Sequence, residues 1–275
     1  MPEGWLRDRT MWQKCGISSV FCRCGLGLGC IERGATSPII CGSLLRPLRK
    51  ESRLSWVIKA FSSSIGKKLL LAITGLALCG FLVAHLAGNL LLYVGPEAYD
   101  KYADALHAQK LLLPIAEVGL LGLFLVHLVN ALWTNADNKA ARPVGYEMRQ
   151  SKQPPSAFLK PASSVMYGTG IVVLLFLLLH LSDFRFELRN PAVAEMTPFV
   201  KAKVLLRNPV TAIVYIIGSC ALGYHVSHGL QSAFQTLGVN HPKYTGAIGA
   251  ASRAFGLIVA LGFGSFPLWA WAFHS

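Results

Sequence analysis

Four histidines stand inside apolar runs of this chain, where an ionisable side chain is costly and is usually kept for a function. They are His85, His127, His180 and His225. Neutral imidazole is a common ligand for transition metals, and two imidazoles from separate helices can bind one haem iron from its two faces. The competing interpretation is that each histidine only forms a hydrogen bond within a helix bundle.

Small residues share the helical face of His225. Gly218, Ala221, Gly229 and Ser232 lie seven and four residues before it and four and seven residues after it, so a helix places them all on its side. Such a face leaves a flat slot beside the backbone, which suits a planar macrocycle such as haem. The same pattern is also typical of close helix packing in membranes.

His228 follows His225 by one helical turn, so this run offers two candidate ligands. We take His225 as the ligand because the small residues are centred on it. His228 is then an alternative ligand, or a side chain that bonds a haem propionate or a partner subunit.

The composition is that of an integral membrane protein, with 53% hydrophobic and only 14% charged residues. The net charge of +13 comes without basic clusters interleaved with aromatics, which argues against nucleic-acid binding. We predict an all-α integral membrane protein with five transmembrane helices, the first four forming a haem-binding bundle. No convincing internal repeat is found. The predicted helices cover residues 69–94, 111–133, 165–181, 210–234 and 255–273.

Residues 1–54 differ from the rest, because they mix Arg, Cys, Gly and Ser without a sustained period or an apolar run. We interpret this segment as a disordered or misannotated extension, with a targeting peptide as the alternative. Residues 55–275 form the predicted five-helix domain.

The depth of each histidine follows from the topology. Lys and Arg near the helix ends favour a cytoplasmic N-terminus. His85 and His180 then lie late on helices that run outward, and His127 and His225 lie late on helices that run inward. With about 1.5 Å of rise per residue, each pair falls within roughly one turn of a common level. Two levels of paired imidazoles predict two b-type haems.

Several segments carry a resemblance to a known family: SSSIGKKLLLAITGLALCGFLVAHLAGNLLLY, LFLVHLVNALW, and YHVSHGLQSAFQTLG followed by NHPKY. Together they resemble the cytochrome b558 membrane anchor of bacterial succinate dehydrogenases and related quinol:fumarate reductases, the five-helix, two-haem type. The resemblance runs from residue 55 to the C-terminus, and residues 1–54 match nothing in it. It implies that His85 and His180 hold an outer haem, and that His127 and His225 hold an inner one.

The resemblance also implies partners and a location. A flavoprotein and an iron–sulfur subunit would dock on the cytoplasmic side of a bacterial inner membrane, and this subunit would pass electrons to a lipid quinone, with menaquinone favoured. Dicarboxylate chemistry would lie on the partners, because this chain has no P-loop and no cysteine cluster for an iron–sulfur centre. The chain would be the quinone-reactive subunit of an oxidoreductase.

Quinone reduction consumes two electrons and two protons, so a protonatable side chain near the outer haem is expected. Glu117, early on the second helix, is our first candidate, with a structural hydrogen bond as the competing role. Asp183 is either a helix-end residue in water or part of a proton path. His107, in the outer loop, is either part of a proton path or a side chain that only faces solvent.

Two other functions compete with the anchor subunit. One is the cytochrome b of another quinone-linked oxidoreductase, such as a hydrogenase or a formate dehydrogenase. The other is a haem-free proton-coupled transporter whose histidines relay protons, which would favour discontinuous helices and internal repeats.

Overall fold

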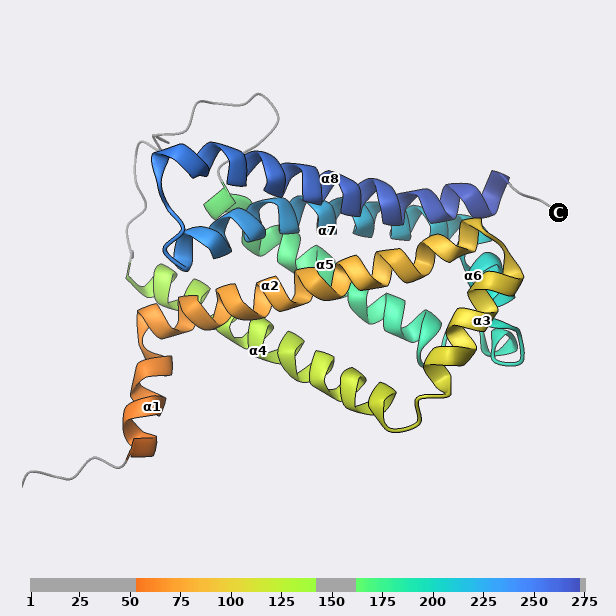
Figure 1. Cartoon of the computed structure of the whole chain (residues 1–275), viewed down its shortest axis with the longest axis horizontal. Coiled ribbons are helices and arrows are strands. Elements are labelled where there is room, and N and C mark those ends of the chain that lie inside the picture. Colours follow the sequence, from red (N-terminus) through yellow and green to blue (C-terminus); the bar gives the residue numbers. More distant parts are fainter. Residues whose placement is uncertain (1–52, 142–161, 273–275) are drawn as a thin grey trace, which may run out of the picture. The chain divides into compact units, whose positions relative to one another are not determined.

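The computed structural model describes residues 53–141 and 162–272 (Figure 1). The predictions for residues 1–52 lie outside these ranges. The described residues form eight α-helices and two short 3₁₀-helices, without a strand. This part of the chain is therefore all-helical, as the composition predicts.

Among the described residues, five helices are long and apolar enough to cross a membrane. This number agrees with the prediction, and a chain with five such helices has the composition of a multi-pass membrane protein. The five are α2 (Ser64–Asn89), continued by the 3₁₀-helix η1 (Leu90–Tyr93), and then α4 (Leu112–Ala140), α5 (Ala162–Phe184), α7 (Pro209–Thr236) and α8 (Pro242–Ala272).

The long helices extend beyond the predicted apolar runs at several ends. The last predicted helix begins at residue 255, whereas α8 begins at Pro242. The second predicted helix stops at residue 133, whereas α4 continues to Ala140. These extra turns are polar: Asp137 of α4 forms an ion pair with Lys67 of α2 at 2.7 Å. An apolar run marks only the buried or lipid-facing length of a helix, so it underestimates helices with polar ends.

Local signals explain where two of the long helices begin. The Ser63 side chain accepts a hydrogen bond from the Gly66 amide at 3.0 Å and caps α2. The Asn208 side chain accepts from the amides of Val210 and Thr211 and caps α7, where Pro209 occupies the first helical position.

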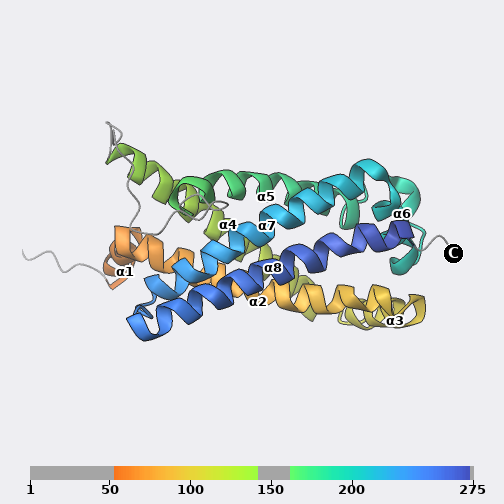
Figure 2. The same cartoon turned by 90° about the horizontal axis from the view of Figure 1, so that it is seen from above.

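Three short helices were not predicted: α1 (Arg53–Ser62), α3 (Pro96–His107) and α6 (Pro198–Arg207). Residues 53 and 54 belong to α1, so the predicted boundary at residue 54 falls inside a helix. α3 and α6 pack together, and the Asp100 carboxylate of α3 accepts from the Phe199 amide in the first turn of α6 at 2.8 Å. Both views place α3 and α6 at the end opposite α1 (Figures 1 and 2).

The long helices pack as two pairs joined through α2 and α7. α4 packs on α2, α5 packs on α7, and α2 and α7 pack on each other. α8 lies along α7 (Figure 2), where Gly223 and Gly256 bring the two backbones together. A Cβ on Gly223 would lie 2.4 Å from the Gly256 carbonyl oxygen, so neither position has room for a side chain.

Candidate functional site

His85 of α2 and His180 of α5 lie against each other near the α6 end of the helices, and we call them the α6-end pair. Their ring centroids are 5.9 Å apart and their ring planes meet at 86°. The Nδ1 atom of His180 is buried and has no hydrogen-bond partner. Aromatic rings surround the pair: Phe81, Phe176, Phe184, Tyr215 and Phe263.

Two imidazoles from separate helices that lie this close would be able to bind one metal ion between them, because bonds from a metal to imidazole nitrogens are about 2.0–2.1 Å long. In residues 53–141 and 162–272 there is no cluster of three or more His, Cys, Asp or Glu that could hold an ion by protein ligands alone. A haem iron takes only two ligands from the protein, so the α6-end pair would supply the number of ligands that a haem requires.

His127 of α4 and His225 of α7 both lie towards the α1 end, each against a neighbouring long helix, and we call them the α1-end pair. The Nδ1 atom of His127 is hydrogen-bonded to Thr74 Oγ1 of α2 at 3.1 Å. The Nδ1 atom of His225 is hydrogen-bonded to Thr169 Oγ1 of α5 at 3.2 Å. With both Nδ1 atoms engaged, Nε2 is the nitrogen left on each ring for a ligand.

A glycine follows each of these threonines. A Cβ on Gly75 would lie 3.4 Å from Cε1 of His127, and one on Gly170 would lie 3.5 Å from Cε1 of His225. Each imidazole therefore rests against the bare backbone of a neighbouring helix, and a side chain larger than alanine at either glycine would press on the ring.

These contacts reveal an internal repeat. Thr74 and Gly75 precede His85 by eleven and ten residues, and Thr169 and Gly170 precede His180 by the same numbers. Each threonine bonds a histidine on the next long helix, 53 or 56 residues later. The helix pairs α2–α4 and α5–α7 are therefore two copies of one arrangement.

The sequence analysis found no convincing repeat, because the shared positions are few. The repeated signal is Thr-Gly, nine residues, His, and the intervening apolar residues differ between the copies. Any of several apolar side chains can face lipid. The two copies therefore share a residue only at positions where the side chain, or its absence, makes a specific contact. Thr74 and Thr169 are the residues of the candidate site that the sequence interpretation missed.

The small-residue face of α7 packs against α5 on both sides of His225. Phe176 of α5 lies over Gly218, where a Cβ would be 2.4 Å from the ring, so packing fills this part of the predicted slot. Beside Gly229 a Cβ would lie 3.8 Å from Met166 Cε, which is an ordinary van der Waals contact. Close helix packing therefore describes Gly218, and a haem beside His225 stays a prediction.

His228 lies beside Tyr224, with ring centroids 4.7 Å apart. Its Nε2 atom is buried and has no hydrogen-bond partner. This atom is available to a further group.

Glu117 and Asp183, the two predicted quinone-site candidates, lie in different surroundings. Glu117 of α4 forms an ion pair with Arg185 at 3.1 Å, and both side chains are exposed. Asp183 is only 1% exposed, which excludes a helix-end residue in water. His107 ends α3 and is exposed.

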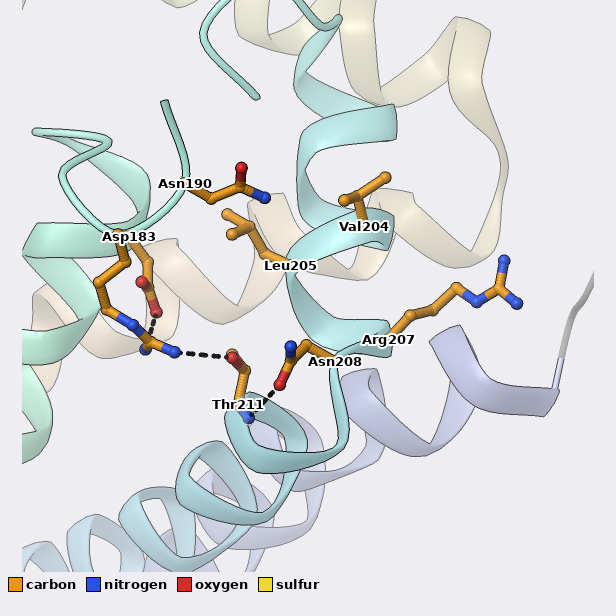
Figure 3. A pocket seen from close by; sticks show the side chains of 8 residues that line it. Asp183, Asn190, Val204, Leu205, Arg207, Asn208 and Thr211 are labelled. Carbon is orange, nitrogen blue, oxygen red and sulfur yellow. Dashed lines mark hydrogen bonds and ion pairs between the residues drawn. The ribbon is translucent and has the colours of Figure 1, made fainter. Parts of the chain in front are cut away.

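Asp183 anchors a polar network between α5 and α7. Its Oδ2 atom accepts from Arg189 at 3.1 Å and from the Tyr215 hydroxyl at 2.9 Å, while Oδ1 is buried without a partner. Arg189 also donates to Thr211 at 3.1 Å. A cavity of about 400 Å³ opens beside this network (Figure 3). It is lined by Asp183, Arg189, Asn190, Val204, Leu205, Arg207, Asn208 and Thr211.

Comparisons with protein families, characterised proteins and solved structures yield no match to this chain. The class that the structure defines is a multi-pass membrane protein of five long helices. Within it, two histidine pairs lie at matching places of an internal repeat.

Proposed function

We propose that this chain is a di-haem cytochrome b, the membrane-anchor subunit of a succinate dehydrogenase or quinol:fumarate reductase. The observation that carries the proposal is the pairing of equivalent histidines from the two copies of the repeat. Each pair combines one imidazole from α2 or α4 with its counterpart from α5 or α7. A packing role would not require the same residue type at all four places.

The chain's own contribution is to bind and orient. His85 and His180 would hold one haem, and His127 and His225 the other. Bound haem b supplies reversible one-electron transfer. The threonines hold the α1-end imidazoles in place, and the apolar helices exclude water from both pairs.

Electrons would pass from an iron–sulfur subunit, itself served by a flavoprotein, to a membrane quinone such as menaquinone. Glu117 and Asp183 are the proposed proton-handling carboxyls, because both lie towards the same end as His180. We further propose a bacterial inner membrane, with the N-terminal side of α2 in the cytoplasm. The likeness of the sequence to such anchor subunits supports these assignments.

Haem content tests the proposal directly. The full chain is purified in detergent after expression with adequate haem supply, and haem b is measured per chain by the pyridine haemochrome method. We expect two haems in the wild type and about one in His85→Ala and in His127→Ala, because each variant loses one ligand pair. The combined variant is expected to hold none.

His107→Ala is the matched control, because His107 is exposed at the end of α3 and belongs to neither pair. It should keep both haems. A wild type without haem would refute the cytochrome, and a His85→Ala variant that loses both haems while its fold is intact would refute two independent pairs. A cytochrome b of another quinone-linked enzyme would also hold haem, so the partner is identified by whether flavin and iron–sulfur signals co-purify.

A haem-free transporter is the second candidate, and the internal repeat favours it, since repeats are common in transporters. Transporter sites, however, are typically formed by discontinuous helices. α2, α4, α5 and α7 each continue as one helix through their histidines. The haem measurement separates the two candidates.

A further inference from the structure

We infer that Thr74 and Thr169 are positioning residues that fix the α1-end imidazoles in one tautomer, with the proton on Nδ1 and a free lone pair on Nε2. The inference rests on the proposed function. It assigns a role to two residues outside the histidine pairs. The two proposed haem positions would then differ, because threonines orient the imidazoles of the α1-end pair.

The direction of the Thr74 hydrogen bond follows from what else the hydroxyl contacts. A hydroxyl has one hydrogen to donate. Thr74 Oγ1 lies 2.7 Å from the carbonyl oxygen of Leu70, one turn earlier on α2, and a carbonyl can only accept. The hydrogen of Thr74 therefore points to Leu70, and Oγ1 accepts from Nδ1–H of His127.

Thr169 repeats this arrangement. Its Oγ1 atom lies 3.1 Å from the carbonyl oxygens of Val165 and Met166 on α5 and 3.2 Å from Nδ1 of His225. Donation to the carbonyls again leaves the oxygen to accept from the imidazole. The same assignment at two independent places of the repeat makes a chance contact a poor explanation.

A neutral imidazole that donates from Nδ1 presents its lone pair on Nε2, which is the form that binds a metal. Hydrogen bonds of this kind orient metal-binding histidines and raise their basicity, and their loss typically lowers metal affinity about 10- to 100-fold. At the α6-end pair the Nδ1 atom of His180 has no such partner. The α1-end pair is therefore the one whose ligands are set by threonine.

The test uses Thr74→Val and Thr169→Val, which keep the branched shape and remove the hydroxyl, and Thr74→Ser and Thr169→Ser, which keep it. Haem content and the midpoint potential of each haem are measured by redox titration of the purified chain. We expect each valine variant to weaken the same one haem about 10- to 100-fold. Where that haem is retained, its potential should rise, because a less basic imidazole stabilises ferric iron less. The serine variants should match the wild type.

Thr236→Val is the control, because the Thr236 hydroxyl of α7 also bonds a backbone carbonyl, that of Ser232, and is exposed. It should change neither haem. The inference is overturned if the valine variants keep both haems with unchanged potentials, if Thr74→Val and Thr169→Val affect different haems, or if serine fails as valine does. A wild type without haem would instead refute the proposed function, so the two failures are distinguishable.

Discussion

The ion pair of Asp183 with Arg189 allows a stability effect to be worked out from the structure. Replacing Arg189 by methionine removes the cation but leaves a carboxyl that is 1% exposed. Removing one partner of a fully buried pair costs about 3–5 kcal/mol. The Arg189 side chain is 38% exposed, and Tyr215 still donates to Asp183, so we expect a loss below this range, about 2–3 kcal/mol.

The double variant Asp183→Asn/Arg189→Met tests the cause. It leaves no charge buried, so it should be more stable than Arg189→Met alone by at least about 1 kcal/mol. Helix content followed by circular dichroism during denaturant titration in detergent gives the free energies. Asp137→Asn is the matched control: its ion pair with Lys67 also joins two long helices, but Asp137 is 53% exposed, so we expect a loss below about 1 kcal/mol. An Arg189→Met variant within about 0.5 kcal/mol of wild type, or strict additivity in the double variant, would refute the reasoning.

Two further predictions concern packing and quinone chemistry. Gly223→Ala should destabilise the protein by about 1–3 kcal/mol, because its Cβ would lie 2.4 Å from the Gly256 carbonyl oxygen. Gly229→Ala is the control and should cost far less, because the nearest atom to its Cβ is 3.8 Å away. Thermal unfolding in detergent compares the two variants, and equal melting temperatures would contradict the close approach. Glu117→Gln breaks an exposed ion pair with Arg185 and should change stability by less than about 1 kcal/mol. In the proposed cytochrome it should nevertheless slow quinone reduction by the assembled complex while both haems still become reduced, and an unchanged rate would leave Glu117 a structural role only.

The number of membrane helices could be predicted because each carries an apolar run near the length that a bilayer requires. Their ends could not, because turns such as those around Asp137 are polar and are stabilised by contacts with another helix. The short helices α3 and α6 escaped prediction for a related reason. They depend on tertiary contacts, such as the one between Asp100 and the Phe199 amide, and not on a strong period of their own.

The candidate site also contains residues that the sequence predicts and residues that it does not. The four histidines stand out because an ionisable residue in an apolar run is rare. Thr74 and Thr169 do not, because a threonine in a membrane helix commonly bonds its own backbone, and both do so here. Only the packing of neighbouring helices brings each hydroxyl to an imidazole. Asn89 and Asn130, which are closer to histidines in sequence, bond the carbonyls of His85 and Val126 on their own helices.

The internal repeat has an electrical consequence. α2 and α5 are the first and third long helices and run in the same direction, so the axis relating the two copies runs along the helices and across the membrane. His85 follows Thr74 by eleven positions on α2, a rise of about 16 Å, which is roughly half of a 30 Å hydrocarbon core. In the proposed cytochrome, an electron moving between the levels would cross about half of the transmembrane voltage, so every 100 mV would change its energy by about 1 kcal/mol.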